Sequence, residues 1–131
     1  MSRPQVQRDD VILVIDDDTK TLESVGRVLI SEGFTVHTAP GPLEGIKAYE
    51  THSTTIKLVL LDYFMHIMNG EEVFEQLQRI NPAVRVVLVT GSDDELAQRM
   101  LARGLCGFLR KPFVPEELLS HIQEQLRGAG R

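Results

Sequence analysis

Residues 11–18 read Val-Ile-Leu-Val-Ile-Asp-Asp-Asp, an apolar run that ends in three acids. Residues 58–62 read Leu-Val-Leu-Leu-Asp and repeat the pattern. A continuous apolar run is typical of a strand buried on both faces, as in a parallel sheet. Ligand sites in such sheets lie at the carboxyl ends of the strands, so we expect these acids to share one site. Clustered carboxylates repel one another unless a hard cation such as Mg²⁺ lies between them, so the pattern favours metal-assisted chemistry.

The rest of the chain alternates short β-favouring runs with amphipathic segments. Gly33 is expected at the C′ position of the first helix and Pro42 in the first turn of the second. This alternation predicts an α/β fold, a single five-stranded parallel sheet with helices on both faces. The expected strands are residues 11–15, 34–38, 56–61, 84–89 and 105–109; the expected helices are residues 19–32, 42–51, 70–80, 92–102 and 115–126.

Length and composition indicate one ordinary domain. The chain has 131 residues, of which 42% are hydrophobic and 25% charged, enough for a core without disulfides. We expect the domain to span residues 9–127, with flexible termini at 1–8 and 128–131. The net charge of −5 argues against direct nucleic acid binding by this domain. No signal peptide or membrane span is visible, which favours a cytoplasmic protein, and the lone Cys106 is expected to be a small buried hydrophobe.

Four of the five expected strands deliver a polar residue to the same edge of the sheet. Asp16 and Asp17 follow the first strand, Asp62 the third, Thr90 the fourth and Lys111 the fifth. A magnesium ion would take carboxylate oxygens while one carboxylate attacks a phosphorus atom. The lysine ammonium and the threonine hydroxyl would then bind further phosphoryl oxygens. The set therefore predicts phosphoryl transfer to an aspartate.

Together with three short motifs, these residues make the chain resemble the receiver domain of two-component response regulators. The resemblance runs from about Asp9 to Leu126 and implies a flavodoxin-like (βα)5 fold with strand order 2-1-3-4-5. The matching residues are Asp16-Asp17, Asp62, Met68-Asn69-Gly70, Thr90-Gly91 and Lys111-Pro112-Phe113.

The resemblance implies a role for each acid. Asp62 would accept a phosphoryl group from the phosphohistidine of a sensor histidine kinase. Asp17 and Asp62 would bind Mg²⁺ (or Mn²⁺) directly and Asp16 through water, with the backbone carbonyl of Phe64 as a further ligand. Such a domain is a phosphoacceptor that catalyses only its own phosphorylation and dephosphorylation, rather than an enzyme acting on other substrates.

The resemblance also implies how phosphorylation would be transmitted. Thr90 and Lys111 would hold the phosphoryl group, and Phe108 stands at the aromatic switch position, where the ring follows the threonine inward. The Lys111-Pro112 bond would be cis. Residues 92–126 would form the face that binds a downstream protein or output domain and that forms a homodimer on phosphorylation; no membrane contact is implied. Met1 favours a receiver at the start of its protein.

Several positions invite a more local interpretation. His66 replaces the proline usual in the family; it would either titrate at the rim of the pocket or be a solvated loop residue. Phe64 would shield the phosphoryl group from water, which predicts a long-lived phosphoaspartate. Asp18 is expected to be a helix N-cap. The three glutamates of the third helix are expected to form a solvated face: Glu71, Glu72 and Glu75.

Three alternative functions fit the sequence less well. A pseudo-receiver, acting as a phosphorylation-independent interaction module, would normally lack one of the five site residues, and none is missing. A phosphohydrolase of the haloacid-dehalogenase type would carry threonine where Lys20 stands. A flavin-binding module would need a phosphate-binding loop after the first strand, where three aspartates would repel a phosphate.

Overall fold

The computed structural model describes residues 10–91 and 94–129, which form a central parallel sheet between two layers of helices. The five strands have the order β2-β1-β3-β4-β5, with every neighbouring pair parallel. This confirms the predicted fold class and strand order. The strands are β1 Val11–Ile15, β2 Thr35–Ala39, β3 Ile56–Asp62, β4 Val86–Thr90 and β5 Gly107–Arg110; the helices are α1 Thr19–Ser31, α2 Pro42–His52, α3 Gly70–Ile80, α4 Asp94–Leu101 and α5 Pro115–Ala129.

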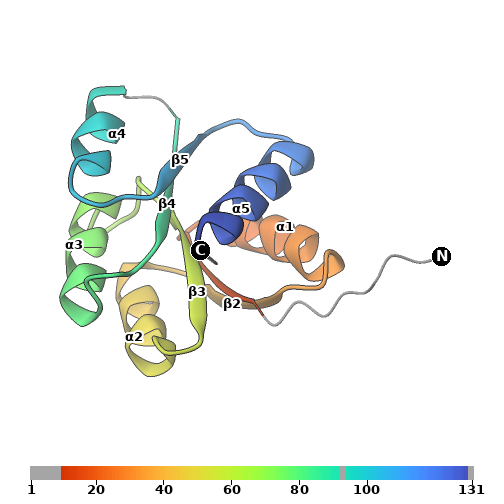
Figure 1. The fold of residues 1–131 in the computed structure, drawn as a ribbon, viewed down its shortest axis with the longest axis horizontal. Helices are drawn as coiled ribbons and strands as arrows, with labels where there is room; N and C mark the ends of the chain where they lie inside the picture. Colours follow the sequence, from red (N-terminus) through yellow and green to blue (C-terminus); the bar gives the residue numbers. More distant parts are fainter. Residues whose placement is uncertain (1–9, 92–93, 130–131) are drawn as a thin grey trace.

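Helices α1 and α5 cover one face of the sheet, and α2, α3 and α4 cover the other (Figure 1). Alternate residues of each central strand point to opposite faces and so supply two cores. Leu13 and Ile15 of β1 pack on the α2–α3–α4 side, and Ile12 and Val14 pack on the α1–α5 side. Burial on both faces explains why the strand sequences are continuously apolar.

Several element boundaries differ from those expected. Strand β2 starts at Thr35 rather than at residue 34, because the Phe34 amide donates to the Leu29 carbonyl at 3.2 Å and ends the helix turn. Strand β4 starts at Val86 rather than at residue 84, because the Val84 amide donates to the Asn81 carbonyl at 3.0 Å. Strand β5 starts at Gly107 rather than at residue 105.

The observed C-terminal end of the domain differs from the expected one. Helix α5 continues to Ala129, so residues 128–129, expected in a flexible tail, are helical. The expected helix over 92–102 is observed over Asp94–Leu101. The remaining predicted tail residues, 1–8 and 130–131, and the expected helical positions 92–93 lie outside the described residues.

Local sequence signals account for the ends of several helices. Asp18 is the N-cap of α1, as predicted, and its carboxylate accepts from the Lys20 amide at 3.0 Å. Gly33 has φ +96°, a value that favours glycine, and its amide donates to the Ile30 carbonyl at 2.9 Å. Asn69 caps α3 and forms a reciprocal capping box with Glu72.

Gly70 lies where the start of α3 approaches the end of β3 most closely. Its amide donates to the Tyr63 carbonyl at 2.8 Å. A Cβ added at Gly70 would lie 2.8 Å from Tyr63 Cα and 2.9 Å from the Asp62 carbonyl oxygen, both backbone atoms. Only glycine fits there without a backbone shift, so this residue sets the distance between α3 and the acidic edge of the sheet.

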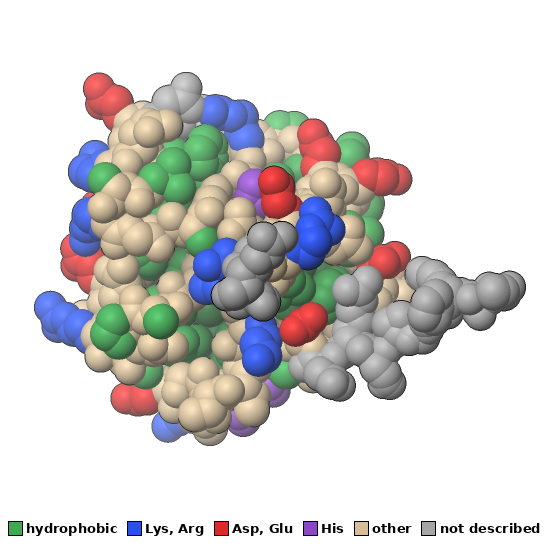
Figure 2. Space-filling model, in the orientation of Figure 1, with side chains coloured by type: hydrophobic (Ala, Val, Ile, Leu, Met, Phe, Trp, Pro, Cys, Tyr) green, Lys and Arg blue, Asp and Glu red, His purple; other side chains and the backbone are tan. Residues whose placement is uncertain are grey.

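Surface composition and the lone thiol agree with an ordinary globular domain. Figure 2 shows Lys and Arg side chains interspersed with Asp and Glu side chains over the visible face. Within residues 10–91 and 94–129, no helix is long and apolar enough to cross a membrane. Cys106 is partly buried against the α1–α5 core, and desolvation raises the pKa of its thiol, so it is a packing residue in its neutral form.

Candidate functional site

Three carboxylates converge at the carboxyl edge of β1 and β3. Asp16, Asp17 and Asp62 each offer an oxygen atom, and these atoms all lie within 4.8 Å of one another. Asp16 and Asp62 are only 4% and 5% exposed, whereas Asp17 is half-buried at the rim. The alignment of β1 and β3 explains the convergence, because Ile15 pairs with Leu61 and each strand delivers its acid one residue later.

Lys111 closes this cluster from the β5–α5 connection. Its Nζ donates to Asp62 Oδ1 at 2.8 Å and lies 3.9 Å from Asp16 Oδ2. The Lys111 amide donates to the Thr90 carbonyl at 2.8 Å, which ties the end of β5 to the end of β4. The Lys111–Pro112 peptide bond is cis, the geometry that the resemblance implied.

Burial among like charges changes the ionisation of both inner acids. Desolvation, with a smaller contribution from Asp62, raises the pKa of Asp16 from 3.8 to about 6 although the Asp18 amide hydrogen bond lowers it. Desolvation also raises the pKa of Asp62, outweighing the opposing hydrogen bond and charge of Lys111. Desolvation lowers the pKa of Lys111, but its hydrogen bond and charge interaction with Asp62 prevail and the pKa is raised. The site therefore destabilises two ionised carboxylates and stabilises one ammonium.

Thr90 ends β4 beside these groups and is 2% exposed. Its Oγ1 is buried and has no hydrogen-bond partner among residues 10–91 and 94–129. A buried hydroxyl without a partner is costly, so its presence favours a role that is fulfilled only when another group enters the site. Phe108 of β5 is partly buried against the α2–α3–α4 core, with the Arg110 guanidinium carbon 5.8 Å from its ring centroid.

The rim of the site contains a hydrogen bond that the sequence did not reveal. The backbone amide of His66 donates to Asp17 Oδ2 at 2.9 Å. The His66 side chain is 96% exposed, with Nε2 3.9 Å from the same oxygen, as expected for a solvated loop residue. The residue identity alone suggested an imidazole role, whereas the contact is made by the main chain.

Phe64 lies on the same loop and is 69% exposed, with its ring edge-on to that of Tyr63 at 4.8 Å between centroids. The role of its backbone carbonyl as a metal ligand stays a prediction. A surface groove of about 660 Å³ is lined by α1 and Thr38 and contains none of the five site residues. The convergence of charged groups, and not this groove, locates the site.

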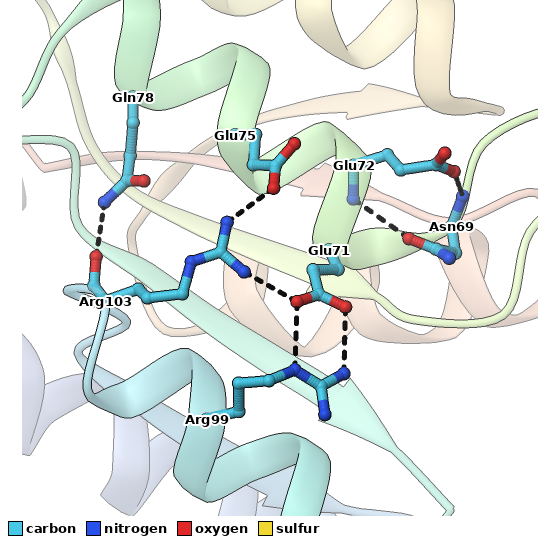
Figure 3. Close-up of polar contacts among 7 residues, drawn as sticks. All are labelled: Asn69, Glu71, Glu72, Glu75, Gln78, Arg99 and Arg103. Carbon is cyan, nitrogen blue, oxygen red and sulfur yellow. Dashed lines mark hydrogen bonds and ion pairs between the residues drawn. The ribbon is translucent and has the colours of Figure 1, made fainter.

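The expectation of a solvated glutamate face on α3 was wrong for Glu71, whose side chain is only 18% exposed, whereas Glu72 and Glu75 are exposed (Figure 3). Glu71 is paired with both Arg99 and Arg103, and Glu75 is paired with Arg103. The signal for these pairs is weak in the sequence, because the partners are 28 and 32 residues apart. On the opposite face of the sheet, Gln125 of α5 accepts from Arg85 at 2.9 Å.

Comparison with known proteins identifies the family. Residues 12–123 match the family model for the response regulator receiver domain. The chain belongs to this family. Among curated relatives, the receiver domain is 32% identical to the sensor kinase CckA of Brucella abortus (strain 2308) over 117 residues, 88% of this chain and 12% of CckA. It is 28% identical to the chemotaxis protein CheY of Treponema pallidum (strain Nichols) over 118 residues, 88% of this chain and 82% of CheY.

A third relative, the transcriptional regulatory protein GlrR of Escherichia coli (strain K12), is 32% identical over 88% of this chain and 26% of its own length. The chain thus spans less than a third of the length of CckA and GlrR. The same receiver module therefore occurs in a sensor kinase, a transcriptional regulator and a chemotaxis protein.

Solved structures share the fold over nearly the whole receiver domain. The receiver domain protein from Clostridium thermocellum superposes with a TM-score of 0.87 at 25% identity, covering 92% of this chain and 97% of the other. A CheY-like receiver domain protein from Methanospirillum hungatei JF-1 gives a TM-score of 0.82 at 32% identity, covering 91% and 94%. CheY in a CheX–CheY–BeF3–Mg²⁺ complex from Borrelia burgdorferi gives 0.84 at 25% identity, covering 88% and 87%.

The donor set of this chain fits a magnesium ion. Receiver domains use Mg²⁺ at an acidic pocket, and the three grouped carboxylates here offer the hard oxygen ligands that this ion prefers. Desolvation raises the pKa of both Asp16 and Asp62, so their ionised forms are destabilised in this buried position. A divalent cation ligated by these carboxylates would stabilise their ionised forms.

Proposed function

We propose that this receiver domain accepts a phosphoryl group on Asp62 from the phosphohistidine of a sensor histidine kinase. The observation that carries the proposal is the arrangement around Asp62. Its Oδ1 accepts from Lys111, its neighbours are two further carboxylates, and the unpartnered Thr90 hydroxyl ends the adjacent strand. A structural ion pair would need Lys111 and one acid, and it would not explain the other groups.

In the transfer, a carboxylate oxygen of Asp62 bonds to phosphorus as the phosphorus–nitrogen bond of the phosphohistidine breaks. The electron pair of that bond stays on the imidazole nitrogen, which takes a proton from solvent. Lys111 pairs with a phosphoryl oxygen in place of Asp62 Oδ1, and Thr90 donates its free hydroxyl hydrogen to another. The protein contributes positioning and charge, which are the main terms in phosphoryl transfer.

Asp17 and Asp62 are the proposed direct ligands of Mg²⁺ (or Mn²⁺), with the Phe64 carbonyl as a further ligand and Asp16 acting through water. When bound, the ion offsets negative charge on the phosphoryl oxygens and on the attacking carboxylate. The His66 amide holds Asp17 Oδ2 at the rim, which leaves the second oxygen of Asp17 available. The BeF3–Mg²⁺ complex of the Borrelia burgdorferi CheY supports this metal in the family.

The conformational response is proposed to run through Thr90 and Phe108. Drawing the Thr90 hydroxyl toward the phosphoryl group would vacate space next to β5, and the partly buried Phe108 ring would move inward. The face built by α4, β5 and α5 would then change its affinity for a downstream protein, an output domain or a second copy of the chain. A cytoplasmic location, with no direct binding to nucleic acid or membrane, completes the proposal.

Intact-mass measurement after incubation with Mg²⁺ and acetyl phosphate tests the acceptor. The parent chain should gain one phosphoryl mass, and Asp62→Asn should gain none. Glu50→Gln, which neutralises an exposed acid on α2, is the matched control and should behave as the parent. Equal mass gain in the parent and in Asp62→Asn would contradict the assignment of Asp62, and Mg²⁺-independent gain would contradict the metal requirement.

A further inference from the structure

An ionic cluster made by Glu71, Glu75, Arg99 and Arg103 joins α3 to the end of α4 (Figure 3). Both carboxylate oxygens of Glu71 accept from Arg99, from Nε at 3.2 Å and from Nη2 at 3.0 Å. Arg103, which follows α4, donates from Nη1 to Glu71 at 2.6 Å and from Nη2 to Glu75 at 2.5 Å. Glu71 therefore binds two arginines, one on α4 and one in the turn that follows α4.

A hydrogen bond to the main chain of Arg103 also joins α3 to the turn after α4. Gln78, two turns along α3 from Glu71, donates from Nε2 to the Arg103 carbonyl at 2.8 Å. The turn after α4 is thus held through both the side chain and the backbone of Arg103. Because the contacts come from three positions on α3, they fix the direction of this turn as well as its distance from α3.

The Glu71 contacts differ from an ordinary surface ion pair. The Glu71 side chain is 18% exposed, while those of Arg99 and Arg103 are 55% and 36% exposed. The hydrogen bond with Arg99 holds the pKa of Glu71 below its usual value, so the carboxylate stays charged. Bidentate arginine pairs that form a network are stronger and better oriented than isolated exposed pairs, which contribute little.

Apolar packing and the ionic cluster both hold α4. Among its described side chains, Leu96, Ala97 and Met100 are buried, and Leu101 is partly buried against the α2–α3–α4 core. The ionic cluster joins the C-terminal half of α4 to α3 and adds a defined orientation to this packing.

The ionic cluster is connected to the acidic site through the backbone at the start of α3. Glu71 directly follows Gly70, whose amide is bonded to the Tyr63 carbonyl, and Tyr63 directly follows Asp62. The α3 end of the cluster is therefore anchored to the phosphoacceptor strand. The start of α4, in contrast, follows Thr90 closely along the chain.

We propose that Glu71 is an ionic latch that holds the C-terminal half of α4 against α3 and opposes displacement of α4 on phosphorylation. Its regulatory part rests on the proposed phosphoacceptor function, but the latch itself does not. Neutralising Glu71 frees Arg99 and Arg103 from their shared carboxylate and raises the population of the displaced helix. The latch thereby sets how much of the free energy of phosphorylation is needed to move this part of the output face.

Hydrogen exchange of the full, metal-free chain tests the latch directly. We expect residues 94–103 to exchange roughly three- to tenfold faster in Glu71→Gln than in the parent at low salt, since release of the cluster favours local opening. Sodium chloride at about 0.5 M should accelerate exchange in the parent but have little effect in Glu71→Gln, because screening acts on the ion pairs. Glu50→Gln should keep the exchange and the salt response of the parent.

A double-mutant cycle separates the latch from a general loss of structure. Glu71→Gln, Arg103→Gln and the double variant are compared, with the exchange of α2 as an internal measure of folding. Non-additive effects on α4 exchange support the pairing, and additive effects would overturn it. An equal salt response of α4 in the parent and in Glu71→Gln would overturn it as well.

Phosphorylation by acetyl phosphate with Mg²⁺ tests the regulatory part. We expect Glu71→Gln to be phosphorylated about threefold faster, because its α4 is already released and the reactive conformer is more populated. Equal rates in a variant whose α4 exchange is accelerated would overturn the regulatory part. Failure of the parent to be phosphorylated while the latch is seen by exchange would instead count against the proposed phosphoacceptor function.

Discussion

Replacement of Asp16 by asparagine should stabilise the metal-free protein, although it removes a residue of the site. Asp16 is 4% exposed, and desolvation raises its pKa to about 6 from 3.8. An asparagine is neutral at every pH, and its Oδ1 can still accept the Asp18 amide, which lies 2.9 Å from Asp16 Oδ1. The variant therefore removes the buried charge and keeps the local hydrogen bond.

The size and the sign of the effect follow from the pKa shift of Asp16. A carboxyl group with a higher pKa in the folded state contributes stability when protonated, and this contribution is lost as pH rises through the folded pKa. For a pKa of 3.8 in the unfolded chain and about 6 in the folded chain, ionised Asp16 destabilises the fold by about 3 kcal/mol near pH 8. This destabilisation is about half as large at about pH 5 and small at about pH 4.

Urea unfolding in the presence of a chelator, at about pH 5 and about pH 8, measures this difference. Asp16→Asn should exceed the parent by up to about 3 kcal/mol at the higher pH and by about half as much at the lower pH. Glu23→Gln, which neutralises an exposed acid on α1, should change stability by less than about 0.5 kcal/mol. Added Mg²⁺ should stabilise the parent more than Asp16→Asn. An advantage that is independent of pH, or no advantage at about pH 8, would refute burial of the Asp16 charge as the cause.

Three further substitutions probe the start of α3, the core and the loop beside the site. Gly70→Ala should destabilise the domain by about 1–3 kcal/mol and slow phosphorylation, because the added Cβ meets backbone atoms of Asp62 and Tyr63; unchanged urea unfolding would contradict this. Phe74→Ala should cost about 3–5 kcal/mol in the same assay, because Phe74 is fully buried in the α2–α3–α4 core. If the ring of Phe64 excludes water, Phe64→Ala should shorten the lifetime of the phosphoaspartate measured by intact mass, and loss of phosphate from the parent within seconds would contradict the shielding.

The fold was predictable because its signals are local and repeated. The continuous apolar run of β1 requires a strand covered on both faces, and the acids at its end mark the edge where ligands bind. The carboxylate cluster followed from the same logic, since it depends on strand ends and not on side-chain detail. The strand starts at Thr35 and Val86 were missed because turn hydrogen bonds of Phe34 and Val84, and not residue type, decide them.

The contacts between elements could not be predicted in the same way. The Glu71–Arg103 pair depends on how α3 and the end of α4 face each other, and charged helix residues look alike in sequence whether solvated or paired. The His66 amide contact to Asp17 depends on the path of the loop and on no side chain at all. Both contacts involve residues distant in the chain, so periodicity and spacing carry no information about them.

The packing of each element indicates which part of the domain can move when Asp62 is phosphorylated. Strands β1 and β3, which carry the acids, are flanked on both faces by fully buried side chains, so displacing them would open cavities in both cores. Helix α4 lies outside the sheet and is joined to α3 by the ionic cluster, so its displacement breaks no strand pairing. A phosphoryl group that binds Thr90 is therefore expected to leave the tightly packed sheet in place and to displace a helix outside it. The mechanical response should appear mainly in α4, which is where the Glu71 latch acts.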